Sequence, residues 1–228
     1  MKKLGKKNNW AAYLYILPLM LLSFAVVYYC IIRTFMTSFT DWNGMSPEMN
    51  FVGLKNYIKL FKDATFWKSV TNNVIFFFGT VFVQAAVGFF LAVLLKKKLP
   101  GSNLFKAVYF MPIAMATSII TAIFRIIMDP TNGALNQFLH AIHLDMFAVS
   151  WLGDKRYALL SVIIVNIFQW MGFSMITYYA SLMSLPDDVY EAAKIDGAGF
   201  WRTLTSVTFP MVKGTTNVLI ILGIVGSL

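Results

Sequence analysis

The sequence has little charge and a single cysteine. Only 13% of its 228 residues are Asp, Glu, Lys or Arg, whereas 58% are hydrophobic; ordinary soluble domains carry about 25% charged residues. Such a chain is too apolar to be intrinsically disordered. With Cys30 as its only cysteine, it is not a disulfide-stapled scaffold. A soluble globule of this composition would have to bury nearly every residue, so we expect a membrane protein.

Positive charge is more abundant than negative charge, and the formal net charge is +9. The lysines occur in short clusters between long apolar runs, which is the pattern that sets topology in a bilayer. No basic stripe with interleaved polar faces occurs, and this excludes a nucleic-acid-binding function.

Long apolar runs dominate the chain, and none of them alternates as the strand of a membrane barrel would. Because a helix needs about 20 apolar residues to cross the hydrocarbon core, five spans are predicted. They cover residues 11–33, 70–95, 107–128, 157–184 and 212–228. The sequence therefore predicts an all-α polytopic membrane protein. The fifth run is still apolar at residue 228, so we expect a sixth span that truncation has removed.

Clusters of lysine predict the orientation. Residues 1–10 contain four lysines, and Lys96, Lys97, Lys98 and Lys106 surround the loop between the second and third spans. Both regions should lie in the cytoplasm, as should the loop 185–211, which makes this a multi-pass protein of the bacterial or archaeal cytoplasmic (inner) membrane. The segment 51–70 has helical amphipathic spacing, which predicts a helix on the outer membrane surface, or one that docks a partner.

The loop between the fourth and fifth spans is long and well punctuated. Ser184 and Asp187 have capping-box spacing, which predicts a helix that begins near Leu185. Gly197 should bend the chain before a second short helix over 200–207, and Pro210 should mark the turn into the last span. The small side chains that precede Gly197 would allow another protein to approach closely, and a carboxylate there could anchor it.

The residues of this loop resemble a known motif. Glu191-Ala192-Ala193, followed by Gly197 and then by Phe209-Pro210, is similar to the EAA loop of permease subunits in binding-protein-dependent ABC importers. The longer string Glu-Ala-Ala-x-x-Asp-Gly-Ala resembles the carbohydrate-uptake branch, of maltose or glycerol-phosphate type. Short strings elsewhere agree with that branch. They are Phe110-Met111-Pro112, Pro130-x-x-Gly133-x-x-Asn136 and Trp151-Leu152-Gly153-Asp154.

The resemblance implies a type I ABC importer permease fold over residues 11–228. The chain would form half of the translocation pathway for a sugar or sugar-like solute, beside a second homologous permease subunit and membrane lipid. An extracellular or periplasmic solute-binding protein would deliver the solute. ATP-binding subunits, which would hold ATP and Mg²⁺, would dock on the loop. The residues implied in this coupling are Glu191, Ala192, Ala193, Asp196, Gly197 and Pro210.

No enzymatic activity is predicted for the chain itself. It has no phosphate-binding loop with the required Lys and Ser/Thr, so ATP hydrolysis and its cofactors should reside on partner subunits. No catalytic nucleophile–base pair is recognisable. A metal site needs at least three well-placed ligands, and an external surface helix explains His140, His143 and Asp145 better.

Polar residues within two spans are candidates for the solute pathway. Asn166, Gln169 and Trp170 are spaced as one helix face, and Gly172 would let a ligand or a helix approach the backbone. Amide and indole groups hydrogen-bond sugar hydroxyls, but the same groups also join helices inside membranes. By resemblance, Gly223 and Ser227 of the last span border the same site, and small residues there are equally expected to pack.

Two other classes of function remain as alternatives. An intramembrane enzyme would need clustered acids or histidines at one membrane face, whereas the acids of this chain are scattered through its loops. A channel or secondary carrier should show charges buried within its spans or inverted repeats. Neither feature is recognisable in the sequence.

Overall fold

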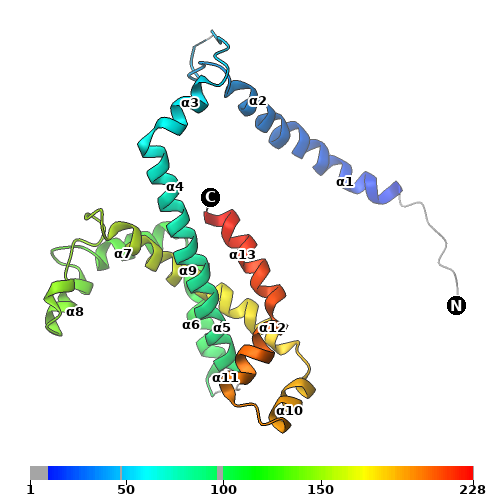
Figure 1. The fold of residues 1–228 in the computed structure, drawn as a ribbon, viewed down its shortest axis with the longest axis vertical. Helices are drawn as coiled ribbons and strands as arrows, with labels where there is room; N and C mark the ends of the chain where they lie inside the picture. The colour runs from blue at the N-terminus through cyan, green and yellow to red at the C-terminus, as the bar shows by residue number, and fades with distance from the viewer. Residues whose placement is uncertain (1–9, 47, 97–99, 228) are drawn as a thin grey trace. The chain divides into compact units, whose positions relative to one another are not determined.

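The computed structural model describes residues 10–46, 48–96 and 100–227. In these residues the chain is helical, with one isolated β-bridge, so the predicted all-α fold is confirmed. The chain divides into two compact units, Met1–Lys68 and Ser69–Leu228 (Figure 1). Of the basic segment 1–10 that we predicted to be cytoplasmic, all but Trp10 lies outside the described residues, as do Lys97 and Lys98.

The first unit begins with a long exposed helix. Its parts are α1 (Trp10–Ser23), the π-helical turn η1 (Phe24–Tyr28) and α2 (Tyr29–Thr37). A loop follows, in which the Asp41 carboxylate accepts hydrogen bonds from the backbone and side chain of Asn50. These bonds hold the pKa of Asp41 below its ordinary value. The loop leads into the short helix α3 (Lys55–Lys62).

The amphipathic helix expected over 51–70 is shorter than predicted. Phe51 pairs with Thr40 in the β-bridge, and Gly53 has a φ of +59°, a conformation that does not continue into a helix. Asp63, in an extended conformation, ends α3. The aromatic residues that follow Asp63 in this segment therefore belong to the next helix, which begins at Ala64.

The second unit contains the helices that pack together. The boundary between the units falls within α4 (Ala64–Phe77), which continues through η2 (Phe78–Phe82) into α5 (Val83–Lys96). The remaining elements are α6 (Ser102–Ala114), α7 (Thr117–Ile127), α8 (Ala134–Ala141), η3 (Asp145–Phe147), α9 (Ala158–Met183), α10 (Asp187–Ile195), α11 (Phe200–Thr203), η4 (Leu204–Thr208), α12 (Phe209–Met211) and α13 (Lys213–Ser227).

Helix α9 is the centre of the second unit and packs along both α5 and α6 (Figure 1). Two of its polar side chains bond to α13. The Tyr178 hydroxyl donates to the Thr216 hydroxyl over 2.9 Å, and the Thr215 hydroxyl donates to that of Ser181 over 2.8 Å. Around these bonds lies a buried apolar cluster. Its members are Ala92, Tyr178, Leu182, Val212 and Leu219. Hydrogen bonds between helices of this kind are typical of membrane bundles.

Two glycines bring α9 close to its neighbours. A Cβ on Gly88 of α5 would lie 2.9 Å from the backbone nitrogen of Met175, and a Cβ on Gly172 would lie 1.9 Å from the backbone oxygen of Tyr109 in α6. Since no side chain fits at either distance, both helix crossings require glycine.

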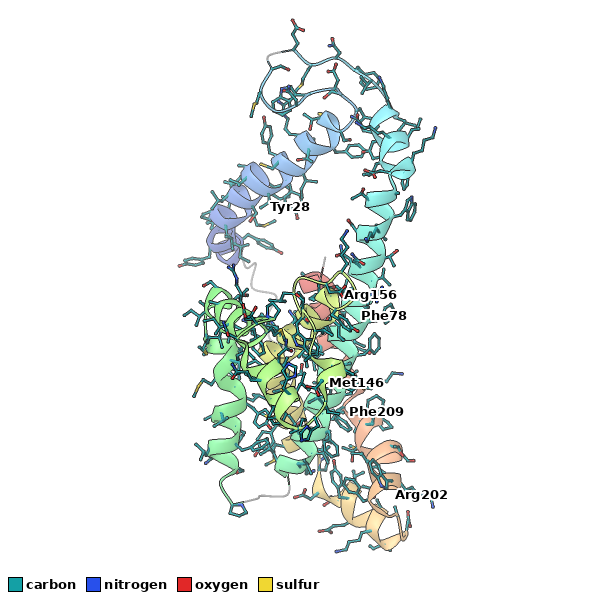
Figure 2. All side chains as sticks on the ribbon, turned by 90° about the vertical axis from the view of Figure 1, so that its left-hand side faces the viewer. Tyr28, Phe78, Met146, Arg156, Arg202 and Phe209 are labelled. Atoms are coloured by element: carbon teal, nitrogen blue, oxygen red, sulfur yellow. The ribbon has the colours of Figure 1, made fainter. Side chains whose placement is uncertain are left out.

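By length and composition, three helices of the described chain could each cross a membrane. These are Tyr13–Thr37, Ala64–Lys96 and Ala158–Met183, and two bent helix pairs raise the number to five if each pair is one span. Their apolar side chains project outward, as Phe78 and Phe209 do in the second unit (Figure 2). A helix surrounded by lipid exposes such side chains on all faces.

The third predicted span, 107–128, differs most from expectation. Instead of one straight helix, the structure has α6 and α7, which meet at an angle of 98°. Pro112 has no N–H for the last turn of α6, and Met115 and Ala116 are extended. The fifth predicted span, 212–228, corresponds to α13, and a bend of 65° separates α13 from the loop helix that ends at Met211.

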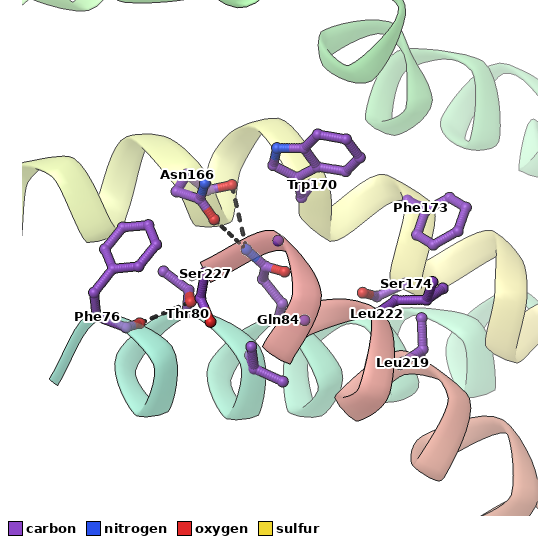
Figure 3. Close-up of a pocket in the computed structure, with 13 residues that line it drawn as sticks. Phe76, Thr80, Gln84, Asn166, Trp170, Phe173, Ser174, Leu219, Leu222 and Ser227 are labelled. Atoms are coloured by element: carbon purple, nitrogen blue, oxygen red, sulfur yellow. Dashed lines mark hydrogen bonds between the residues drawn. The ribbon is translucent and has the colours of Figure 1, made fainter. Parts of the chain in front are cut away.

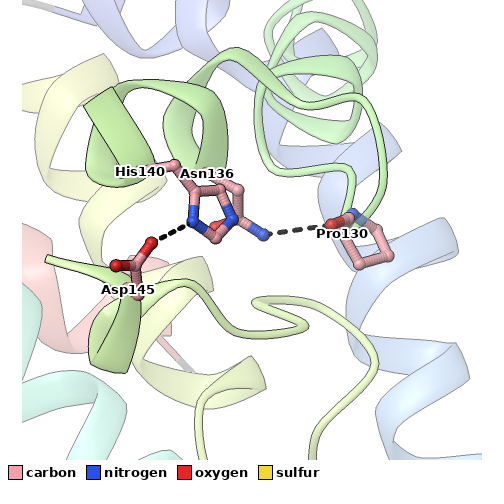
Figure 4. Close-up of polar contacts among 4 residues, drawn as sticks. All are labelled: Pro130, Asn136, His140 and Asp145. Carbon is pink, nitrogen blue, oxygen red and sulfur yellow. Dashed lines mark hydrogen bonds and ion pairs between the residues drawn. The ribbon is translucent and has the colours of Figure 1, made fainter. Parts of the chain in front are cut away.

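Two of the three short strings that supported the resemblance are joined by hydrogen bonds of Asn136 in α8. The buried Asn136 side chain donates to the backbone oxygen of Pro130 (Figure 4). It also donates to the backbone oxygen of Val149 and accepts a 2.7 Å bond from the Trp151 indole. The Asn136 amide is thus fully hydrogen-bonded within the chain, and its bonds fix the loop before α9.

Candidate functional site

A cavity of about 340 Å³ opens between α5, α9 and α13 (Figure 3). We call it the amide pocket. It is lined by Phe76, Thr80, Val81, Gln84, Asn166, Trp170, Phe173, Ser174, Leu219, Leu222, Gly223, Gly226 and Ser227. None of these thirteen lining residues is charged. Its size and its mixture of aromatic, apolar and a few polar groups are typical of small-molecule sites.

A pair of side-chain amides spans the amide pocket. The Gln84 amide nitrogen on α5 donates a 2.7 Å bond to the Asn166 side-chain oxygen on α9 (Figure 3). This bond leaves the Gln84 carbonyl and the Asn166 N–H groups without a partner in the described part of the chain. The pair therefore offers both an acceptor and donors to a hydroxyl-bearing solute.

Aromatic rings on α9 border the amides. Trp170 is 41% exposed, and its ring meets that of Phe173 edge to face, with centroids 6.5 Å apart. An exposed indole beside amide groups provides both a face for stacking and an N–H donor. This combination suits the alternating apolar faces and hydroxyl edges of a sugar ring.

Four of the six predicted pathway residues line the amide pocket, and two do not. Asn166, Trp170, Gly223 and Ser227 are lining residues. Gln169 is 96% buried on another side of α9, where its amide nitrogen donates to the Thr117 hydroxyl of α7 over 3.1 Å. Gly172 lies in the crossing with α6. Asn166, Gln169 and Trp170 share one face of α9, but this face borders both the amide pocket and α7. Asn166 and Trp170 therefore line the pocket, while Gln169 contacts α7.

Three further polar residues line the amide pocket. They are Thr80, Gln84 and Ser174, which are not among the predicted pathway residues. A polar side chain within an apolar run is itself a signal of a bundle interior or a cavity. That signal singles out Gln84, but its partner on α9 becomes visible only in three dimensions.

The loop helix α10 begins later than predicted. Pro186 is its N-cap residue and Asp187 its first residue, so the predicted start near Leu185 and the capping box are wrong. The Ser184 hydroxyl instead donates to the backbone oxygen of Ser181 over 2.7 Å. Two aspartates in the first turn and Lys194 in the last turn favour this helix through its dipole.

Most of the loop residues implied in coupling are exposed. Glu191, Ala192 and Asp196 are accessible, whereas Ala193 is 92% buried against the chain itself. The exposed side of α10 therefore presents a carboxylate beside a single methyl group. Such a surface permits close approach and one charge-assisted hydrogen bond.

Gly197 ends α10 in a left-handed turn. Its φ is +70°, and the Ala198 N–H donates back to the Ala193 oxygen over 2.9 Å, which closes the helix. Asp196 is the C-cap residue, and its backbone N–H bonds to the Ala192 oxygen. The bend is thus made by backbone geometry that only glycine adopts readily.

The second loop helix is longer than the predicted 200–207. It continues from α11 through η4 and α12 to Met211, and Pro210 lies within it. The sharp bend falls at Val212, two residues after Pro210. Since proline cannot donate to a preceding carbonyl, it weakens the helix just before this bend.

The two histidines do not form a metal cluster. His140 in α8 contacts Asp145 over 2.5 Å (Figure 4). His143 lies in the following turn with a φ of +59°. Among the residues that the structure describes, no group of three or more His, Cys, Asp or Glu side chains could hold a metal ion.

A family model and individual relatives among known proteins agree on one family. Residues 7–228 match the model of the binding-protein-dependent transport system inner membrane component. The probable ABC transporter permease protein YurN of Bacillus subtilis is 37% identical over 97% of this chain and 76% of its own length. The lactose transport system permease protein LacF of Rhizobium radiobacter is 31% identical over 100% of this chain and 75% of its own length.

The fold agrees with a solved structure. A chain from the crystal structure of a bacterial alginate ABC transporter, in complex with a periplasmic protein that carries an alginate pentasaccharide, matches with a TM-score of 0.80. The match covers 97% of this chain and 74% of that chain, at 22% sequence identity.

Proposed function

Because the chain belongs to the binding-protein-dependent transport system inner membrane components and is a permease subunit of an ABC importer, we propose that it carries an uncharged sugar. It would form half of the pathway, with a homologous permease subunit forming the other half. Separate ATP-binding subunits would dock on the exposed side of α10, and a solute-binding protein would deliver the sugar from the opposite side. Residues 1–10 would lie in the cytoplasm.

The amide pocket is the observation that carries this proposal. Its polar groups are amides, hydroxyls and an indole, and none of its lining residues is charged. Moving a charged group into an apolar cavity without a counter-charge is costly. A phosphorylated polyol would therefore be disfavoured, while the hydroxyls of a neutral mono- or oligosaccharide would match the Gln84–Asn166 pair.

The names of two relatives agree with a saccharide but do not identify it. LacF is a lactose permease and the solved structure belongs to an alginate transporter. The uncharged lining of the amide pocket favours a neutral sugar such as lactose over a phosphorylated sugar. A thermal-shift screen of the solute-binding partner with neutral sugars and sugar phosphates would identify the solute.

Two glutamines on this chain provide a matched test. Gln84→Leu removes an amide from the pocket, so KM for sugar transport should rise about 5- to 30-fold, as a lost hydrogen-bonding group costs about 1–2 kcal/mol. Gln169→Leu removes an amide that bonds to α7, and it should lower stability while leaving KM unchanged. The assay is ATP-driven uptake into liposomes that contain the whole transporter.

The opposite pattern would refute the assignment of the pocket. If Gln169→Leu raised KM and Gln84→Leu did not, the solute would pass on the α7 side of α9. If the chain transported sugar without ATPase subunits, the importer mechanism itself would be contradicted.

A further inference from the structure

Two buried polar groups near the loop helix have no hydrogen-bond partner. They are the Lys96 ammonium nitrogen and the Tyr190 hydroxyl, and both are shielded from solvent in the described part of the chain. The Lys96 nitrogen lies 3.6 Å from the centroid of the Tyr190 ring. The face of this ring is thus the group that stabilises the ammonium ion.

The contact joins elements that are far apart in the sequence. Lys96 is the last residue of α5, and Tyr190 lies in α10 directly before Glu191. Helix α10 is joined by the chain to α9 and, through α11 and α12, to α13, but not to α5. The two side chains also border a cavity of about 200 Å³ between α5, α9 and the loop helices.

A buried ammonium ion makes this contact sensitive to position. Removing a cation from water is unfavourable unless another group compensates. The attraction to an aromatic face acts only when the cation lies over the ring at short range. The energy of the pair therefore favours one arrangement of α10 relative to α5.

Helix α5 connects this contact to the amide pocket. Gln84 and Lys96 lie twelve residues apart on one helix without a break, which is a distance of about 18 Å at 1.5 Å per residue. The π-helical turn η2 ends at Phe82, before this stretch begins. A displacement at Lys96 is therefore passed along a rigid segment to the Gln84–Asn166 pair.

We propose that Lys96 and Tyr190 form a positioning pair that transmits movement of the loop helix to α5. The inference rests on the proposed function, since it requires ATP-binding subunits that move α10. Docking at Glu191 displaces the adjacent Tyr190, and the cation–π contact carries α5 with it. The pocket is then reshaped from α5 as well as from α9.

The test measures coupling rather than activity alone. We expect Lys96→Met and Tyr190→Leu each to lower the number of sugar molecules transported per ATP hydrolysed by about 3- to 10-fold in the reconstituted transporter. The double variant should be no worse than either single variant, because both remove the same contact. Tyr190→Phe keeps the ring and should retain the wild-type ratio.

A second cation–π pair provides the control. Lys106 of α6 lies 4.5 Å from the centroid of the Tyr179 ring in α9, so that pair does not involve the loop helix. Lys106→Met and Tyr179→Leu should reduce the amount of folded transporter at most and leave the ratio unchanged. A purely structural role of Lys96 and Tyr190 would give the same result.

Several outcomes would overturn the inference. A ratio within twofold of wild type for Lys96→Met or Tyr190→Leu would do so, as would Tyr190→Phe behaving like Tyr190→Leu. A wild-type complex that hydrolysed ATP without moving sugar would instead contradict the proposed function. In that case a double-mutant cycle on the melting temperature of the permease still decides whether the pair forms, and purely additive effects would refute it.

Discussion

Replacing Gly172 by alanine would place a methyl group against the backbone of α6. The added Cβ would lie 1.9 Å from the Tyr109 oxygen and 3.1 Å from the Phe110 Cα, whereas ordinary contact begins at 3.4 Å. One of the two helices must therefore move by about 1.5 Å. The obstacle is backbone, so no side-chain rotation relieves it.

The size of the effect follows from this overlap. Overpacking a well-packed interior usually costs about 1–3 kcal/mol, and the upper end applies when backbone must shift. For a chain of this length each kcal/mol corresponds to about 2–4 °C in melting temperature. We therefore expect Gly172→Ala to melt about 6–12 °C below wild type.

The measurement is thermal unfolding of the detergent-solubilised permease, followed by tryptophan fluorescence. Gly214→Ala is the control, because a Cβ on this glycine in α13 meets no atom within 4 Å. It should melt no lower than wild type. Because Gly172 lies outside the amide pocket, we expect a loss of stability rather than the loss of a solute contact.

Two results would contradict this reasoning. If Gly172→Ala melted within 1 °C of Gly214→Ala, the close crossing of α6 and α9 would be wrong. If it melted normally but raised KM, Gly172 would border the solute rather than α6, as one reading of the sequence proposed.

Three further predictions concern the loops. Gly197→Val forces a branched residue to a φ of +70°, which costs about 1–2 kcal/mol. A pull-down with this variant should therefore recover less ATPase, and uptake should be lost, while membrane insertion stays normal. The control Gly199→Val, at a φ of −67° and with open space around it, should bind ATPase normally. Asn136→Ala leaves an indole N–H and two carbonyls unpaired, and should cost at least about 2 kcal/mol in a denaturant titration, whereas the exposed neighbour Gln137→Ala should have little effect. The pKa of Asp129 is lowered because its carboxylate accepts two backbone N–H bonds; its turn is therefore stabilised above about pH 4 and loosens as the pH falls through that lowered pKa. A carbon-13 titration midpoint at or above the ordinary aspartate value would contradict this.

The sequence predicted the long helices well because apolar length is a local property. The runs at 70–95 and 157–184 correspond to helices Ala64–Lys96 and Ala158–Met183. The break between α6 and α7 was not predicted, since an extended pair at Met115 and Ala116 leaves no mark on hydropathy. Pro112 is the local signal, but proline also occurs in continuous membrane helices.

The loop was easier to interpret than the pocket. Gly197 has a positive φ, and a glycine at a helix end predicts such a turn from neighbouring residues alone. Lys96 and Tyr190 are far apart in the sequence and carry no shared pattern, so their contact could not be predicted. The same holds for the pairing of Gln84 with Asn166.

The polar residues of α9 explain why composition alone does not locate a pathway. In lipid every polar group needs a partner, so such residues first serve to join helices. Gln169 bonds to α7 and Tyr178 to α13, and both side chains are buried, so neither is accessible to a solute. The Gln84–Asn166 pair differs because it lines a cavity, and two amides contain more donors and acceptors than one hydrogen bond uses. That surplus, beside the exposed indole of Trp170, distinguishes a surface for hydroxylated solutes from an ordinary helix contact.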